Sequence, residues 1–243
     1  MVLWLFAGLL VLGLVYPLIR LQTRLAVKRL WSQGLLRICG VELHVAGQKP
    51  EQGPVLWVVN HVSWLDIFVL NHARSTTFVA KQEIRHWPLI GWLAAGADTI
   101  FIERGYRHAV QRVGQAMQAR FDRGQAVGLF PEGTTSTGFD VLPFYANLFE
   151  PARRAAVPIQ AVALIYYHHG KRSDYAAFVG EETLVRNMWR VLGTTGLSIE
   201  IVFLNSIPAD SLDALKRNEL ASLTRQDIQR AIFQSVSKNS EPI

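Results

Sequence analysis

The chain has 243 residues, half of them hydrophobic, and carries a formal net charge of +6 at pH 7. This length suits one globular domain with at most a small appendage. The single cysteine, Cys39, excludes an intramolecular disulfide and a cysteine-cluster metal site, and it favours a reducing compartment. A basic surface suits nucleic acid, anionic lipid or an acidic substrate, and the charge by itself does not choose among them.

The first 19 residues, MVLWLFAGLLVLGLVYPLI, contain no charged side chain. A run of this length is just sufficient to span a bilayer core, and Pro17 is expected to kink a helix near its end. A signal peptide fits poorly, because no basic residue precedes the run and no small-x-small cleavage site follows it. We therefore predict that residues 1–40 form a membrane-attached helix or helix pair, with a buried core helix as the alternative.

Residues 21–37 predict a basic amphipathic helix whose apolar side chains lie in the membrane interface. These apolar residues are Leu21, Leu25, Leu30, Trp31 and Leu35. The basic residues that follow the apolar run indicate a cytoplasmic side by the positive-inside rule. We therefore expect residues 41–243 on the cytoplasmic side of the inner membrane. Whether residues 1–19 span the bilayer or enter one leaflet stays open.

From about residue 41, short β-branched runs alternate with segments of helical period. Strands are expected at 54–60, 76–81, 98–104, 125–129, 157–167 and 197–205, and helices at 63–73, 83–97, 107–124 and 211–237. The alternation indicates an α/β fold with a mixed, largely parallel sheet flanked by helices. No repeat or linker divides residues 41–243, so they are expected to form one domain.

The stretch NHVSWLD, residues 60–66, places His61 at a strand end and Asp66 in the first turn of a helix. Ser63 and Asp66 form a variant capping box, which predicts a helix start at about Trp64. Each residue turns a helix by ~100°, so a break between strand and helix is what lets Asp66 reach back to the imidazole. Ligands of open α/β sheets bind at the carboxyl ends of strands.

The functional interpretation of this stretch is a His61–Asp66 dyad. Asp66 would hold one ring nitrogen and fix the tautomer, so that the other nitrogen takes a proton from an attacking hydroxyl. The alternative is a helix-capping aspartate beside a satisfied turn histidine. No metal site is predicted, because the neighbours His168 and His169 alternate faces on their strand.

Three later stretches also lie where predicted strands begin or end: FIERG at 101–105, LFPEGTTSTG at 129–138 and VPIQAVAL at 157–164. Together with NHVSWLD, they resemble the four ordered blocks of the glycerolipid acyltransferase family. Lysophosphatidic acid acyltransferases are the best-known branch of this family. The resemblance covers roughly residues 55–165. Four blocks in order make it specific.

The resemblance implies that His61 is a general base that activates a lysolipid hydroxyl. That hydroxyl would attack the thioester carbonyl of acyl-CoA or of an acyl carrier protein, with no covalent acyl-enzyme and no cofactor. The expected reaction is 1-acylglycerol-3-phosphate O-acyl transfer, in which lysophosphatidic acid becomes phosphatidic acid. The expected partners are the lysolipid, the acyl donor and a membrane.

By the same resemblance, a group of cationic, loop and hydroxyl residues binds the acceptor head group. They are Lys81, Arg104, Glu132, Gly133, Thr134 and Thr135. The planar fork of an arginine pairs with phosphate oxygens in two places, and a glycine lets the backbone approach a ligand closely. The alternatives are solvated charges at Lys81 and Arg104 and a simple turn at residues 134–136.

The third block usually reads FPEGTRS in lysophosphatidic acid acyltransferases, whereas here Thr135 replaces the arginine. The form FPEGTTSTG followed by VLPF resembles a branch that includes lyso-ornithine lipid O-acyltransferases. Because Arg104 remains, lysophosphatidic acid is the first choice of acceptor, and lyso-ornithine lipid or another lysophospholipid is the alternative.

Two other classes of function compete with acyl transfer. A thioester hydrolase could use the same dyad, but the apolar surroundings favour a lipid hydroxyl over water. A binding protein without catalysis could use the basic charge. Nucleic acid is disfavoured as its partner, since no recognised binding motif occurs and the basic cluster adjoins the apolar N-terminal segment.

Overall fold

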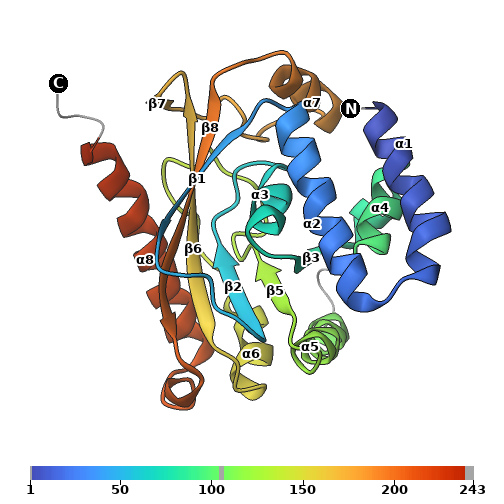
Figure 1. Ribbon diagram of the computed structural model, residues 1–243. Helices are drawn as coiled ribbons and strands as arrows, with labels where there is room; N and C mark the ends of the chain where they lie inside the picture. The colour runs from blue at the N-terminus through green and yellow to red at the C-terminus, as the bar shows by residue number, and fades with distance from the viewer. Residues whose placement is uncertain (1, 104–106, 239–243) are drawn as a thin grey trace.

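The computed structural model describes residues 2–103 and 107–238, with side-chain surroundings for residues 3–103 and 110–235. The described strands form one sheet in the order β1-β8-β6-β2-β5-β3-β4, with β7 paired to β6 (Figure 1). Their bounds are β1 (Glu42–Gly47), β2 (Val55–Val59), β3 (Thr76–Lys81), β4 (Ile100–Ile102), β5 (Ala126–Leu129), β6 (Ile159–His168), β7 (Lys171–Arg172) and β8 (Leu197–Ile207). From β6 to β4 all neighbouring strands are parallel, whereas β8 runs antiparallel to β6. The prediction of an α/β fold with a mixed, largely parallel sheet is confirmed.

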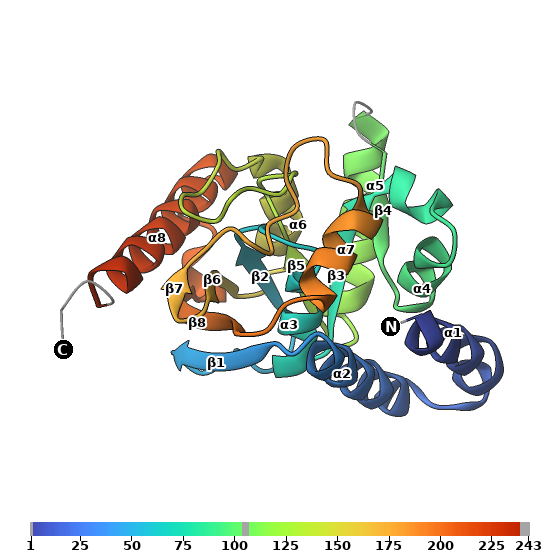
Figure 2. The ribbon, with the colours of Figure 1, turned by 90° about the horizontal axis from the view of Figure 1, so that it is seen from above.

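Helices cover both faces of this sheet. They are α1 (Val2–Leu10), α2 (Leu21–Ile38), α3 (Asp66–Ala73), α4 (Ile90–Gly96), α5 (Arg107–Phe121), α6 (Glu150–Arg154), α7 (Leu184–Leu192) and α8 (Arg217–Lys238). Figure 2 shows α8, α6 and α5 on one side of the sheet and α2 and α3 on the other. Strand β2 is buried along its whole length, because Leu56 and Val58 face the first set of helices and Trp57 faces the second. A central, doubly covered strand therefore leads directly to His61.

The N-terminal segment is a helix pair, as predicted. After α1 the chain passes through a π-helical turn, Val11–Val15, and a 3-10 turn, Tyr16–Leu18, which contains Pro17. Ile19 is extended, and α2 then runs back beside α1 (Figure 1). Within the described ranges, none of the helices combines the length and the apolar character that crossing a membrane requires.

The apolar side of α2 corrects one expectation. Leu35 is buried in the core rather than in a membrane interface, because α2 packs along α3. Trp31 stacks on Trp4 of α1 and contacts Phe68 of α3. Among the apolar residues expected at the interface, Leu30 has the most exposed side chain, at 65%. The first helix exposes more: Leu3 is 85% exposed.

Several element boundaries also differ from the sequence-based ones. The helix expected from Trp64 begins at Asp66, with Leu65 as its N-cap residue. The segment 83–97 divides into a 3-10 helix, Gln82–His86, and α4, because residues 87–89 interrupt it with Pro88 and a positive φ at Leu89. The strand expected at 98–104 covers only Ile100–Ile102, because Asp98 lies in a turn with a positive φ, and Arg104 lies outside the described residues.

Strand β1 and helices α6 and α7 were not predicted. Strand β1 lies at the sheet edge, and its polar–apolar alternation from Glu42 to Val45 was a strand signal that the prediction overlooked. Helix α7 did carry a signal: Thr183 is its N-cap, with a side chain that accepts a hydrogen bond from the Arg186 N–H, and Gly193 follows its last residue.

Candidate active site

The site lies at the carboxyl edge of the sheet, where its central strands end. Strands β2 and β5 are parallel neighbours in a register that pairs Val58 with Leu129. His61 follows β2 and Glu132 follows β5, so both leave the sheet at the same edge. Strand β3 runs parallel on the other side of β5 and ends at Lys81. This edge corresponds to the crevice position where open α/β sheets bind ligands.

His61 and Asp66 form the predicted dyad contact. His61 Nδ1 lies 2.7 Å from Asp66 Oδ2, and the same oxygen accepts hydrogen bonds from the N–H groups of Val62 at 2.8 Å and Ser63 at 3.1 Å. Asp66 is fully buried, at the first position of α3. The break between β2 and α3 therefore lets the carboxylate reach back over the turn, as the sequence indicated. The bond from the Ser63 N–H to Asp66 was predicted as half of a capping box, but Leu65 and not Ser63 is the N-cap of α3.

The backbone on both sides of the imidazole is held by side chains and loops. The side-chain amide of Asn60, fully buried, donates to the Leu164 carbonyl at 2.9 Å and accepts from the Leu164 N–H at 2.8 Å, which ties the end of β2 to β6. The His61 N–H donates to Glu132 Oε1 at 2.7 Å, and the His61 carbonyl accepts from the Ser136 N–H at 2.8 Å. The backbone that carries the imidazole is therefore fixed relative to β6 and to the loop after β5.

The ring of His61 is positioned as well as its backbone. It stacks on Phe130 with centroids 4.1 Å apart, and Phe130 stacks in turn on Phe78. The His61 side chain is 21% exposed. In the neutral tautomer that donates Nδ1–H to Asp66, Nε2 carries a free lone pair, and no described residue hydrogen-bonds it. An approaching hydroxyl therefore meets a nitrogen that can accept its proton.

Glu132 braces this arrangement. Its carboxylate is 3% exposed and accepts backbone hydrogen bonds on both oxygens, from His61 on Oε1 and from Leu142 at 2.9 Å on Oε2. Burial raises the pKa of this carboxyl, and the two backbone hydrogen bonds oppose the rise. The structure thus gives Glu132 a role in joining two loops. Its predicted contact with the head group stays a prediction.

The other loop residues predicted to bind the acceptor are the three that follow Glu132 in the chain. Gly133 has a φ of +67°, a left-handed conformation that favours glycine, so the turn after Glu132 depends on it. The Thr134 side chain is exposed. The Thr135 hydroxyl donates to the carbonyl of Phe178, whose N–H donates to the Val62 carbonyl beside the dyad.

Of the two predicted cations, Lys81 lies within the described residues. Lys81 is half-buried at the end of β3, where it is paired in register with Ile102 of β4. Arg104 lies outside the described residues, two positions beyond Ile102 in the chain. The head-group roles of both residues remain predictions.

Two side-chain hydrogen bonds near the dyad were missed. Tyr166 of β6 donates its hydroxyl to Asp66 Oδ1 at 2.5 Å, and the Trp64 indole N–H donates to Asn187 Oδ1 of α7 at 2.9 Å. Their partners lie 100 and 123 residues away in sequence, and no local pattern reports contacts of that range. The strand alternation of β6 offered a partial signal, since Leu164 and Tyr166 share a face.

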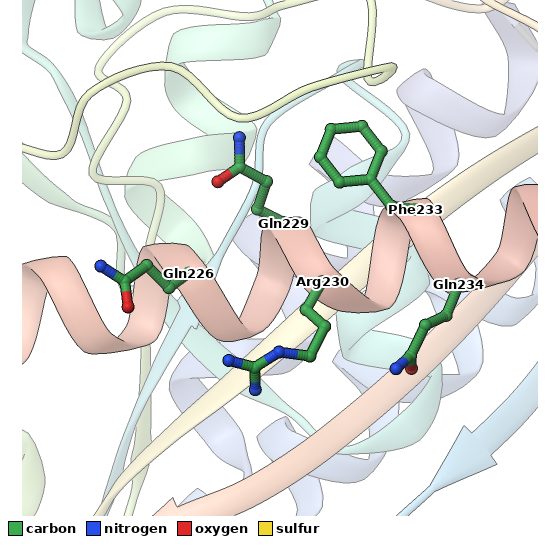
Figure 3. Close-up of a pocket in the computed structure, with 5 residues that line it drawn as sticks. All are labelled: Gln226, Gln229, Arg230, Phe233 and Gln234. Carbon is green, nitrogen blue, oxygen red and sulfur yellow. The ribbon is translucent and has the colours of Figure 1, made fainter.

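A hollow on the surface of α8 does not belong to this site. Figure 3 shows its lining, in which Gln229 and Phe233 project from one side of the helix and Arg230 and Gln234 from the other. None of these side chains belongs to the loops that follow β2, β3 or β5. The candidate site therefore remains the carboxyl edge around His61.

Comparisons with known proteins identify the family of the chain. The acyltransferase family model matches residues 40–165. A lyso-ornithine lipid O-acyltransferase of Pseudomonas aeruginosa is 38% identical over 209 residues, which is 85% of this chain and 79% of that protein. A 1-acyl-sn-glycerol-3-phosphate acyltransferase of Neisseria meningitidis is 35% identical over 203 residues, or 83% of this chain and 78% of that protein.

A solved structure shares the fold. The 1-acyl-sn-glycerophosphate acyltransferase PlsC of Thermotoga maritima superposes with a TM-score of 0.68 at 19% identity, covering 97% of this chain and 94% of that one. At that identity the likeness concerns the fold, whereas the family model and the relatives above 30% identity concern the sequence. The chain therefore belongs to the glycerolipid acyltransferase family, and it is an acyltransferase.

Proposed function

We propose that this protein is a membrane-bound O-acyltransferase that moves an acyl group from a thioester to the free hydroxyl of a lysolipid, with His61 as general base. The observation that carries the proposal is the 2.7 Å contact between His61 Nδ1 and Asp66 Oδ2, which leaves Nε2 as the acceptor nitrogen. The family membership supplies the reaction class, and the geometry supplies a base suited to it.

The chemical step follows from that geometry. The lysolipid hydroxyl gives its proton to His61 Nε2 while its oxygen attacks the thioester carbonyl carbon, and Asp66 stabilises the imidazolium that forms. The tetrahedral intermediate collapses, the C–S bond breaks, and the leaving sulfur takes the proton back from Nε2. The products are an oxygen ester and the free thiol of CoA or of an acyl carrier protein, so no acyl-enzyme is required.

Lysophosphatidic acid and lyso-ornithine lipid are equally supported as acceptors in this proposal. Relatives at 38% and 35% identity carry the lyso-ornithine lipid and the glycerol-3-phosphate names respectively, and that difference is too small to choose between them. Lys81 and Arg104 would suit the phosphate of lysophosphatidic acid, because charge-assisted hydrogen bonds to phosphate are strong. The neutral Thr135, bonded to the Phe178 carbonyl, suits a head group with less negative charge.

The membrane part of the proposal is supported by the outer side of the first helices. Leu3, Leu10, Leu14 and Leu18 are each more than 60% exposed. A soluble surface rarely gathers large apolar side chains in this way, whereas a lipid interface accepts them. The basic residues of α2 then favour the cytoplasmic face. Flotation of the protein with liposomes tests the attachment, and failure to float would contradict it.

The function is tested with purified protein in liposomes, labelled acyl-CoA or acyl carrier protein, and the two lysolipids in parallel. His61→Ala should abolish acylation, whereas His44→Ala, on edge strand β1, should leave it unchanged. Full activity of His61→Ala would refute the base. Free fatty acid without acylated lipid would instead make the protein a thioester hydrolase.

A further inference from the structure

Asp66 is held by more than the imidazole and the turn. Its oxygen Oδ2 receives three hydrogen bonds, from His61 and from the Val62 and Ser63 N–H groups. Among the described residues, Oδ1 receives a single one, from the Tyr166 hydroxyl at 2.5 Å. Tyr166 is therefore the group that fixes the second oxygen of the carboxylate, and with it the rotation of the whole side chain.

The strand that carries Tyr166 is tied firmly to the dyad loop. Strand β6 is the parallel neighbour of β2, and Asn60, the residue before His61, hydrogen-bonds both backbone groups of Leu164. Tyr166 follows two residues later on the same face of β6, so its hydroxyl reaches Asp66 from a backbone already fixed relative to His61. The contacts of Leu164 with Asn60 and of Tyr166 with Asp66 thus both position the dyad relative to β6.

The hydroxyl is suited to act as a permanent donor. Tyr166 is 3% exposed. Burial raises its pKa well above the usual value, and the charge of Asp66 raises it further, while a hydrogen bond with the Ser63 side chain opposes the rise. The phenol therefore keeps its proton at every pH at which the enzyme would work, and Asp66 always faces a donor on Oδ1.

We propose that Tyr166 is a positioning residue of the His61–Asp66 dyad, which holds Asp66 Oδ1 so that Oδ2 faces the imidazole and which limits the negative charge that His61 experiences. The proposal rests on the proposed role of His61 as general base. Tyr166 touches no substrate in it and acts through Asp66. An alternative role, in which Tyr166 only satisfies a buried oxygen, would affect stability and leave the pH dependence of catalysis unchanged.

The adjacent residue, Tyr167, provides a matched control. Tyr167 is 8% exposed, points to the opposite face of β6, and donates its hydroxyl to Glu200 Oε2 at 3.0 Å. Tyr166→Phe and Tyr167→Phe therefore remove the same atom from adjacent, similarly buried residues, each bonded to a carboxylate. Only the first carboxylate belongs to the dyad.

For Tyr166→Phe we expect kcat to fall about tenfold, as for the loss of a hydrogen bond to a charged group, with KM for donor and acceptor unchanged. The acid limb of kcat/KM should move to higher pH, because more of the carboxylate charge then favours the protonated imidazole. Tyr167→Phe should keep the wild-type kcat and acid limb. A Tyr166→Phe protein whose acid limb coincides with that of the wild type would overturn the proposal.

A second substitution covers the case in which Tyr166→Phe fails to fold. Fluorotyrosine at position 166 keeps the shape of the side chain and makes its hydroxyl a stronger donor, so the acid limb should move to lower pH. An unmoved limb would again overturn the proposal. His61→Ala separates the two ideas: if it is inactive while Tyr166 substitutions change nothing, the base stands and the positioning role falls.

Discussion

The two sides of the candidate site are held to very different degrees. On the dyad side, Asp66 is fully buried and receives four hydrogen bonds, and both backbone groups of His61 are fixed by the loop after β5. On the acceptor side, Thr134 is exposed and Lys81 is half-buried at a strand end. The difference suggests a division of labour. The chemical step proposed for the dyad needs groups placed in advance, whereas the predicted choice of head group would rest on a few side chains that single substitutions can change.

The largest effect is expected at Asp66. In Asp66→Asn, an amide NH2 would replace one carboxylate oxygen, and either orientation sets that NH2 against a donor, the Tyr166 hydroxyl or the group of three on Oδ2. The neutral amide also cannot stabilise an imidazolium. We expect kcat to fall about 10³-fold, by analogy with the aspartate of hydrolase triads. Steady-state kinetics in liposomes measure it.

Asp98→Asn is the control for that substitution. Asp98 is 47% exposed and contacts Arg120 at 3.4 Å, away from the dyad loop. Its variant should keep activity within about twofold, since surface ion pairs contribute little. Equal losses of activity in Asp66→Asn and Asp98→Asn would show that the hydrogen bonds around Asp66 have no particular importance for catalysis.

The firmly held region reaches the N-terminal helices through Lys28. Its ammonium is 8% exposed and donates to the Thr76 carbonyl at 2.9 Å and the Ala97 carbonyl at 3.4 Å, and burial lowers its pKa to about 8. Between pH 8 and 10.5 the unfolded chain binds a proton on this lysine that the folded chain does not, so the free energy of unfolding rises with pH there. At 1.36 kcal/mol per pH unit, the rise is about 3 kcal/mol.

Lys28→Met should remove that rise. The difference between the denaturation profiles of wild type and variant isolates it from other titrating groups, such as Cys39, whose pKa burial raises to about 11. The free energy of unfolding of the variant should therefore fall relative to that of the wild type by about 3 kcal/mol between pH 8 and 10.5. Parallel profiles across this range would mean that burial does not lower the pKa of Lys28.

Glu132→Gln tests the join between the two sides of the site. A glutamine offers one acceptor oxygen where Glu132 offers two, so its NH2 would face the N–H of His61 or of Leu142. We expect the free energy of unfolding to fall by about 2 kcal/mol, the usual effect of an unsatisfied buried group, and activity to fall with it. In Glu200→Gln, where the carboxylate accepts a single tyrosine hydroxyl, both should change less.

The sequence could predict the dyad because all of its parts are local. His61, Ser63 and Asp66 lie within six residues, and a break between a strand end and a helix start allows the carboxylate to turn back toward the imidazole. The parallel sheet was predictable for the same reason, since each strand and helix carries its own period. Strand β1 was missed although Glu42 to Val45 alternate polar and apolar residues, because the alternation covers only about four residues, the lower limit at which it identifies a strand.

Contacts between segments that are distant in the chain could not be predicted from the sequence. Nothing near Tyr166 indicates that its hydroxyl meets Asp66, and nothing near Leu35 shows that α3 covers the face of α2 that resembles a membrane-binding surface. Amphipathic periodicity shows that one face of a helix is apolar. It does not show whether a membrane or another helix covers that face, because this depends on the fold. The acceptor side shares this difficulty, since its residues come from three separate strand ends.

The smallest effect, and the one that sharpens the comparison most, is expected at Thr135. Thr135→Arg places at this position the arginine that the FPEGTRS block usually has and gives up the hydroxyl bond to the Phe178 carbonyl. A cation here should favour the phosphate of lysophosphatidic acid over the lyso-ornithine head group, raising the ratio of their kcat/KM values about tenfold, or 1.4 kcal/mol. Thr135→Val loses the same hydroxyl without adding charge, so it should leave the ratio unchanged. If Thr135→Val shifts the ratio equally, the loop geometry selects the acceptor and its charge does not. If neither variant shifts it, selection lies with the cations beyond β3 and β4.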